Sequence, residues 1–214
     1  CSDAIFKQLS DKYLKIRNTA RYILGNLNGF DPDKDAVALE DMPELDRWAL
    51  SRLDKLIERC LAAYERYEFF TVTSSVHSFC VLDMSNFYLD VIKDRLYCDG
   101  EDSLSRRSAQ TAIYTILDAM VRLLAPLLAF TSNEIWQAMP HTKGADARHV
   151  MLNDMPECDS ARRLSAEAEL KWDNLMRIRD DVNKALELAR AEKLIGKPLD
   201  AKVTVSVSEE ARAA

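Results

Sequence analysis

The segment DAIFKQLSDKYLKIRNTARYILGNLN, residues 3–28, decides the fold class, because its apolar side chains recur at helical spacing. The steps between them are of three or four residues, through Ile5, Leu9, Tyr13, Ile16, Ala20, Ile23 and Leu27. Ser2 can act as an N-cap, and Gly29 follows the last periodic residue. The spacing predicts an amphipathic helix over residues 3–28 that turns one face toward a core.

Helical periodicity continues along most of the chain. It predicts helices over residues 45–67, 70–93, 104–125 and 165–192. A shorter helical segment ends at Met139, and Thr131 and Glu134 have capping-box spacing within it. Between Phe79 and Ile92 the pattern is apolar on nearly all sides, so we expect this helix at the centre of the bundle.

The C-terminal end departs from this pattern. Residues 201–207 alternate with the period of a strand, and a lone strand cannot satisfy its own backbone. We therefore predict an all-α, up-and-down bundle of about five helices with a short truncated C-terminal strand. The expected domains are a helical bundle over 1–195 and the start of a truncated β subdomain over 196–214.

Composition and charge exclude several classes of protein. The net charge of −6 argues against a protein that binds nucleic acid by bulk charge. No stretch reaches the roughly 18 apolar residues that a membrane helix needs, and the N-terminus lacks the pattern of a signal peptide. The five cysteines lie far apart with no C-x-x-C pair, which favours a reduced, cytoplasmic protein without a metal site.

Motifs of catalysis are absent from the sequence. It contains no G-x-x-x-x-G-K-[ST] loop, no G-x-G-x-x-G and no H-E-x-x-H, and none of its three histidines belongs to a Glu-x-x-His pair. We therefore expect no catalytic residue, no metal ligand and no cofactor in this chain.

The distribution of charge is more informative than its total. Residues 1–30 contain five Lys or Arg against two acids. Arg17 and Arg21 share one flank of the first predicted helix, with Asn18 beside them, and such a ridge suits phosphates and base edges. The solvated flank of an ordinary helix would explain the same pattern.

A second candidate set lies near the end of the apolar helix, where Lys93, Arg95 and Tyr97 follow one another closely. Two cations and an aromatic ring suit a single-stranded RNA loop, because phosphates need charge and unstacked bases need a flat face. Cations near a helix C-terminus also stabilise the helix dipole, so both interpretations stay open at this point.

Both sets belong to longer stretches that resemble a known family. These are KIRNTARYILGNLNGFDP (15–32), LDRWALSRL (45–53), SNFYLDVIKDRLY (85–97), LLAPLLAFTSNEIW (123–136), IRDDVNKALELAR (178–190) and IGKPLDAKVTV (195–205). In this order they resemble the anticodon-binding domain of bacterial isoleucyl-tRNA synthetases, which are class I enzymes. The D-R-W element is shared with valyl and leucyl relatives, whereas R-N-T-x-R and Y-L-D-V-I-K-D-R are more particular to the isoleucyl enzymes.

The resemblance implies an RNA-binding module of a longer, cytoplasmic and monomeric ATP-dependent ligase. Its partners would be the anticodon stem-loop of isoleucine tRNA and the catalytic and C-terminal zinc domains of the same polypeptide. ATP and zinc would belong to those other domains, because the HIGH and KMSKS motifs and a cysteine cluster are missing here. The RNA-binding residues it implies are Lys93, Arg95, Arg21, Arg17, Asn18 and Tyr97.

Two alternatives stay open. In the first, the chain is a helical scaffold that binds another protein, and its basic ridge is only solvated. In the second, it is the equivalent domain of a valyl or methionyl relative. The affinity for isoleucine tRNA and its dependence on salt separate the scaffold from an RNA-binding domain, and the K-D-R and R-N-T-x-R elements argue against the valyl or methionyl relative without eliminating it.

Overall fold

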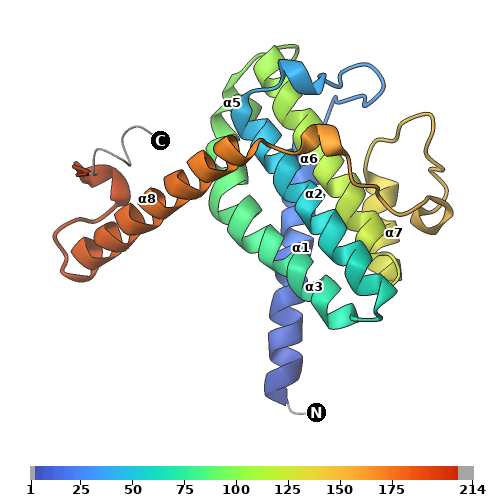
Figure 1. Ribbon diagram of the computed structural model, residues 1–214, viewed down its shortest axis with the longest axis horizontal. Helices are drawn as coiled ribbons and strands as arrows, with labels where there is room; N and C mark the ends of the chain where they lie inside the picture. Colours follow the sequence, from blue (N-terminus) through green and yellow to red (C-terminus); the bar gives the residue numbers. More distant parts are fainter. Residues whose placement is uncertain (1–2, 207–214) are drawn as a thin grey trace. The chain divides into compact units, whose positions relative to one another are not determined.

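The computed structural model describes residues 3–206, which form helices joined by loops and contain no β-strand (Figure 1). The chain divides into two compact units, residues 1–163 and 164–214. The α- and π-helices of the first unit are α1 (Asp3–Asn26), α2 (Glu44–Glu65), α3 (Phe69–Ser78), the π-helix η2 (Phe79–Tyr88), α4 (Leu89–Val91), α5 (Lys93–Cys98), α6 (Leu104–Leu124) and α7 (Ala129–Ala138). Short 3-10 helices lie at Leu39–Asp41, Val150–Leu152 and Ser160–Arg162. The second unit contains α8 (Ala166–Ala191). The predicted all-α class is confirmed, and within residues 3–206 no helix is apolar over a length that would span a bilayer.

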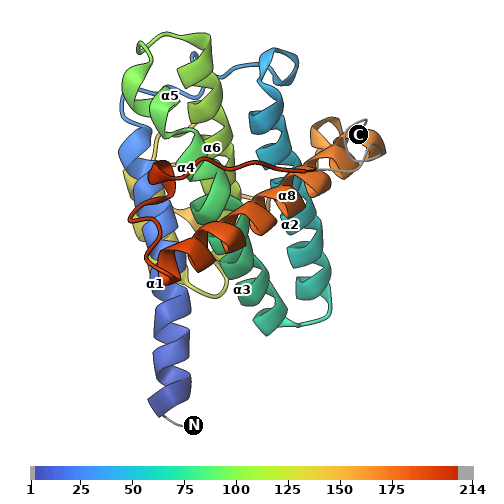
Figure 2. The same cartoon turned by 90° about the vertical axis from the view of Figure 1, so that its left-hand side faces the viewer.

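The core of the first unit is built on α2 and α6, which lie side by side with α3 and α1 packed against them (Figures 1 and 2). Each of these two central helices turns fully buried aliphatic side chains toward the other helices. They include Leu53 and Ile57 on α2 and Ile113, Ile116 and Leu117 on α6. Side chains of this size each stabilise a fold by about 1.5–3 kcal/mol when fully buried.

Helix α1 has two different halves. Ile16, Ala20 and Ile23 are buried, as the predicted stripe requires. Ile5 and Leu9 belong to the same stripe, yet half of each side chain is exposed, and this end of α1 extends beyond the neighbouring helices of its unit (Figure 1). The apolar stripe is therefore a core seam only in the C-terminal half of the helix.

The helix predicted over residues 70–93 is broken into several pieces. It changes from α3 to the π-helix η2, and the α-helical backbone is interrupted at Ile92, where φ is −81° and ψ is 0°. Lys93 therefore begins the short helix α5, whereas the sequence predicted that it would close a long one. The reason is that a segment apolar on nearly all sides has no single stripe from which a break can be located.

Two local predictions are wrong. No strand forms over residues 201–206, because the described chain offers it no partner strand, and Val207 lies outside the described residues. Thr131 does not cap a helix: α7 begins at Ala129, and the Thr131 hydroxyl forms a hydrogen bond with the Tyr13 hydroxyl instead. The domain boundary expected at residue 195 stays a prediction.

Candidate nucleic-acid interface

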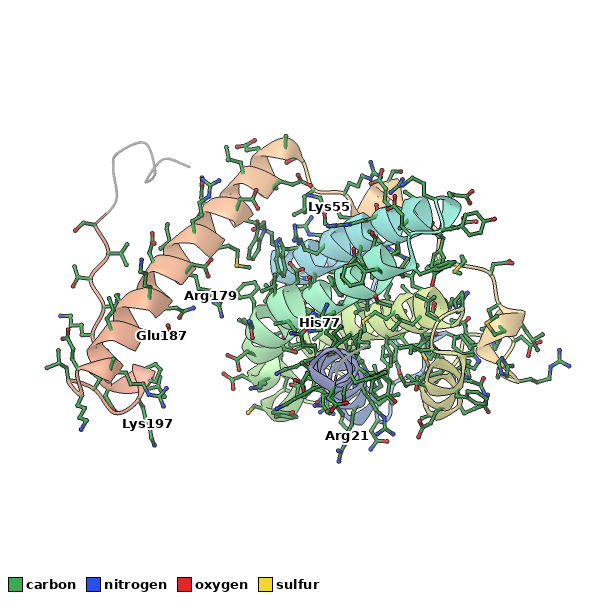
Figure 3. All side chains as sticks on the ribbon, turned by 90° about the horizontal axis from the view of Figure 1, so that it is seen from below. Arg21, Lys55, His77, Arg179, Glu187 and Lys197 are labelled. Atoms are coloured by element: carbon green, nitrogen blue, oxygen red, sulfur yellow. The ribbon has the colours of Figure 1, made fainter. Side chains whose placement is uncertain are left out.

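One side of α1 presents the first set of predicted RNA-binding residues. Because Ile16, Ala20 and Ile23 face the core, helical geometry directs Arg17, Asn18 and Arg21 outward, and all three are exposed. The labelled Arg21 side chain points away from the bundle (Figure 3).

These three residues line a groove between α1 and α7. The groove has a volume of about 280 Å³, and its other lining residues are Leu24, Glu134, Ile135 and Ala138. Arg17 donates a hydrogen bond to the Glu134 carboxylate at 3.4 Å, and both side chains are more than half exposed. The structure thus brings two cations and an amide together at the rim of one concave surface.

The second predicted set is divided by α5, because residues two apart lie on opposite sides of a helix. Lys93 and Tyr97 are exposed, whereas Arg95 points inward. Lys93 pairs with Asp90 at 2.7 Å, and this exposed ion pair raises the pKa of Lys93. The Tyr97 ring is 62% exposed.

Arg95 is held in a buried network with α2 and α6. Its guanidinium donates to both Asp46 carboxylate oxygens, at 2.8 and 2.6 Å, and to the hydroxyl and carbonyl oxygens of Ser105. The Tyr88 hydroxyl donates to Asp46 at 2.7 Å, and the Ser108 hydroxyl donates to the same carboxylate. Burial and the neighbouring Asp46 charge raise the pKa of Tyr88 well above its ordinary value.

The predicted role of Arg95 as a phosphate ligand does not fit this geometry. Four of its five N–H donors have protein acceptors, and its side chain is only 18% exposed beside an Asp46 that is fully buried. Arg95 instead fixes α5 to α2 and α6. Asp46 is the residue that the sequence analysis missed, and a signal was present: it lies four and seven residues before Leu50 and Leu53, on the apolar stripe of α2.

A pair of tyrosines joins α1 to α5. The Tyr97 hydroxyl donates to the Tyr22 hydroxyl at 3.4 Å, and burial raises the pKa of Tyr22. Tyr22 lies one helical turn after Asn18 on α1, so the two side chains are neighbours. One surface therefore runs from the groove through Asn18, Tyr22 and Tyr97 to Lys93, and we call these residues, with Arg17 and Arg21, the α1–α5 surface.

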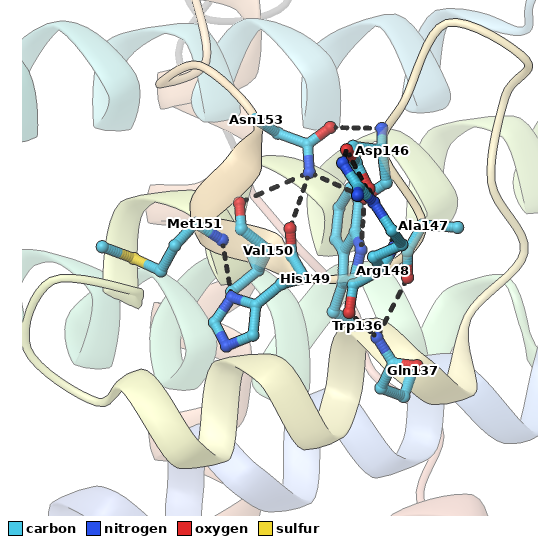
Figure 4. Close-up of polar contacts among 9 residues, drawn as sticks. All are labelled: Trp136, Gln137, Asp146, Ala147, Arg148, His149, Val150, Met151 and Asn153. Carbon is cyan, nitrogen blue, oxygen red and sulfur yellow. Dashed lines mark hydrogen bonds and ion pairs between the residues drawn. The ribbon is translucent and has the colours of Figure 1, made fainter.

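The loop over residues 146–153 supports α7 away from this surface (Figure 4). The Trp136 indole donates to the Asp146 carbonyl at 3.2 Å, and the Gln137 amide donates to the carbonyl oxygens of Ala147 and Arg148 at 3.0 Å. Asn153 closes the loop through hydrogen bonds with the backbone of Asp146 on both its N–H and its carbonyl. These contacts hold α7 through Trp136 and Gln137, which are not among the residues that line the groove.

Two of the cysteine thiols are buried in the core. Burial raises the pKa of Cys60 to about 11 and that of Cys80 to about 12, so both thiols stay protonated at neutral pH. In the part of the chain that the structure describes, no three His, Cys, Asp or Glu side chains are placed to hold a metal ion.

Comparison with known proteins shows the family to which the chain belongs. Residues 46–205 match the family model described as the anticodon-binding domain of tRNA ligase. The chain is 55% identical over 205 residues to an isoleucine–tRNA ligase of Syntrophotalea carbinolica, covering 96% of this chain, and 54% identical over 207 residues to one of Desulforamulus reducens, covering 97%. An isoleucine–tRNA ligase of Desulfitobacterium hafniense is 50% identical over 210 residues, or 98% of this chain. The chain spans 22% of the length of each of these relatives.

Proposed function

Since this chain belongs to the family of anticodon-binding domains of tRNA ligases, we propose that it recognises the anticodon stem-loop of isoleucine tRNA within a longer isoleucine–tRNA ligase. The observation that supports this most is the continuity of the α1–α5 surface. It unites Arg17, Arg21 and Lys93 with an exposed aromatic ring on two adjoining helices.

Each member of the surface has a separate role in this proposal. Arg17, Arg21 and Lys93 hold phosphates, which a mobile or planar cation binds well in water. Asn18 meets the edge of a base, and Tyr97 stacks on an unpaired base, an interaction of about 1–3 kcal/mol. Arg95 acts from behind as a positioning residue, because its bonds to Asp46 fix the helix that bears Lys93 and Tyr97.

The acidic charge of the chain as a whole is compatible with this role. A small cationic surface in a negative field attracts RNA locally and disfavours contact elsewhere, which suppresses non-specific binding. The bound stem-loop would orient the tRNA so that its acceptor end reaches a catalytic domain of the same polypeptide. ATP and zinc would be bound by other domains of that cytoplasmic, monomeric ligase.

A salt titration tests the proposal. The chain is mixed with isoleucine tRNA at several salt concentrations, and the dissociation constant is measured by electrophoretic mobility shift. We expect the logarithm of the affinity to fall linearly with the logarithm of salt, by about 0.7 for each single-stranded phosphate contact. A protein-binding scaffold would show no affinity and no slope, which would contradict the proposal.

Competition with other tRNAs tests the amino-acid identity. Valine and methionine tRNAs are added to the complex formed with isoleucine tRNA. We expect each to displace it only at a clear excess, because base contacts and not phosphate contacts discriminate between loops. Stronger competition by the valine tRNA would assign the domain to a valyl relative.

A further inference from the structure

A second groove lies between α2 and the helical segment that α3 and η2 form together. Its volume of about 360 Å³ falls within the roughly 300–1,000 Å³ of small-molecule sites. Each wall contributes side chains spaced by three or four residues, so each turns one helical face into the groove. The polar members are Arg52, Lys55 and Arg59 on one wall and Ser75, Ser78 and Asp83 on the other, and we call this cavity the α2–α3 groove.

The two ends of the groove differ in charge. Its walls run antiparallel, because only residues 66–68 connect α2 to α3 (Figure 1). Near the start of α2, Arg52 donates to the Asp83 carboxylate of η2 at 2.8 Å. Arg59 lies two helical turns further along α2, which brings it level with Ser75 on the opposite wall. A compensated ion pair therefore closes one end, and cations and hydroxyl groups gather at the other.

The Ser75 hydroxyl gives an independent indication of a ligand. Ser75 is only 7% exposed, and within the described residues its hydroxyl oxygen has no hydrogen-bond partner. A buried hydroxyl without a partner is unfavourable, and most such groups in folded proteins are hydrogen-bonded. Because Ser75 lines the groove, a ligand with acceptor oxygens can supply the partner.

The cationic end of the groove matches the chemistry of a phosphate monoester. Lys55 and Arg59 bring two positive charges to the end where Ser75 lies. A phosphate monoester carries between one and two negative charges at neutral pH, and it has three terminal oxygens that accept hydrogen bonds. The ammonium, the guanidinium and the hydroxyl group can each donate to one of them.

The remainder of the groove fits the organic part of a small ligand better than it fits a continuing RNA strand. Leu56 and Phe79 are buried, Leu82 is 63% exposed, and the three provide an apolar strip along the groove. A strand that followed the groove would carry its next phosphate toward Asp83. That carboxylate repels a second anion and already compensates Arg52.

We propose that the α2–α3 groove is a second ligand site, which binds the phosphate group of a small phosphomonoester such as a mononucleotide through Arg59, Lys55 and Ser75. The site goes beyond the proposed recognition of RNA and does not depend on it. Lys55 and Arg21, both labelled in Figure 3, lie on opposite sides of the first unit. The π-helix η2 starts within the groove, and π-helical turns are rare and frequent at functional sites.

Three adenosine compounds test the inference. Adenosine monophosphate, its methyl phosphodiester and adenosine are titrated into the chain, and isothermal titration calorimetry gives the affinities. We expect the monophosphate to bind about tenfold more tightly than the methyl ester, which lacks one terminal oxygen and part of the charge. Adenosine should not bind, and inorganic phosphate should compete with the monophosphate.

Two variants locate the binding in the groove. Arg59→Ala and Ser75→Ala each remove one donor to the phosphate, so each should weaken the monophosphate about tenfold. Ser74→Ala is the control for the serine, because the Ser74 hydroxyl also lacks a partner within the described residues but does not line the groove. Arg47→Ala removes an exposed arginine of α2 outside the groove, and both controls should bind like the wild type.

Every other outcome contradicts the inference and leaves the RNA-binding function intact. It is overturned if the monophosphate does not bind at millimolar concentration, if the methyl ester binds equally well, or if Arg59→Ala and Ser75→Ala bind like the wild type. Displacement of the monophosphate by a uridine hexamer at a lower concentration than by inorganic phosphate would assign the groove to an RNA strand. Thermal unfolding of each variant, monitored by circular dichroism, verifies that the fold is kept.

Discussion

Two arginine–carboxylate pairs of this bundle have the same chemistry and opposite surroundings. Arg95 and Asp46 are joined at 2.6 Å beneath α5, with Asp46 fully buried, whereas Arg17 and Glu134 lie 3.4 Å apart in solvent. Removing one partner of the buried pair leaves an unpaired charge in the core, while water replaces the partner of the exposed pair. Burial therefore separates the arginine that maintains the architecture from the arginine that is available to a ligand.

Breaking the buried pair should give the largest effect. Asp46→Asn removes the charge that compensates Arg95, so the free energy of unfolding should fall by about 3–5 kcal/mol. Urea denaturation of the chain measures this loss, and Arg17→Ala is the control, with an expected change of about 0–1 kcal/mol. Equal losses of unfolding free energy in Asp46→Asn and Arg17→Ala would contradict the claim that only the buried pair stabilises the fold.

Loss of an exposed cation should affect RNA binding and not stability. Lys93→Ala in the full-length ligase should slow aminoacylation of isoleucine tRNA several-fold while tRNA-independent activation of isoleucine stays unchanged. In the isolated chain the salt slope should fall by about 0.7, the value of one phosphate contact. Both reactions falling together would contradict the role proposed for Lys93.

Lys34→Ala is the matched control for that variant. Lys34 pairs with Asp31 at 2.6 Å, three residues apart like Lys93 and Asp90, but it lies outside the α1–α5 surface. Its loss should leave both the salt slope and aminoacylation unchanged. An equal effect of the two variants would point to net charge and not to a defined contact.

The smallest effect concerns pH and contrasts a half-buried pair, Asp118 with Arg122, with a pair whose arginine is exposed, Asp146 with Arg148. Burial raises the pKa of Asp118 above 3.8 although Arg122 opposes the shift, whereas the hydrogen bonds from Arg148 lower the pKa of Asp146 to about 2. A raised native pKa means that the stability from Asp118 is present below pH 3.8 and lost as pH rises through the raised value. For Asp146 the stability is present above pH 3.8 and lost as pH falls toward 2.

Difference curves test these signs. The free energy of unfolding of Asp118→Asn, subtracted from that of the wild type, should decrease between acid and neutral pH. The corresponding curve for Asp146→Asn should increase over the acid range. Urea denaturation at a series of pH values gives both curves, and slopes of the same sign would contradict the assignment.

Much of the helical framework could be predicted from the sequence, because an apolar stripe with clear end signals locates a helix closely. The helix predicted over residues 104–125 is observed as Leu104–Leu124, where the Ser103 side chain caps the N-terminus and Pro126 follows the end. The segment before it could not be divided in the same way, since most residues from Phe79 to Ile92 are apolar and its few polar side chains do not mark where a helix ends. The break at Ile92 makes Lys93 the first residue of α5, and the sequence did not indicate it.

The candidate site was predictable in part. Arg17, Asn18 and Arg21 were placed on one exposed flank by periodicity alone, and the structure adds the groove beside them. Arg95 was grouped with Lys93 because the two are close in sequence, although a spacing of two residues turns them to opposite sides of a helix. Contacts between distant segments, such as Glu134 with Arg17 or Tyr97 with Tyr22, depend on tertiary packing and leave no local pattern.

Helix α1 continues without a break from its exposed N-terminal half into its packed C-terminal half. With a rise of about 1.5 Å per residue, some 18 Å of continuous helix separate the solvent-exposed Leu9 from Arg21. Because the helix is continuous, the buried seam at Ile16 and Ala20 fixes the direction of the exposed N-terminal half as well as that of the turn that bears Arg17 and Arg21.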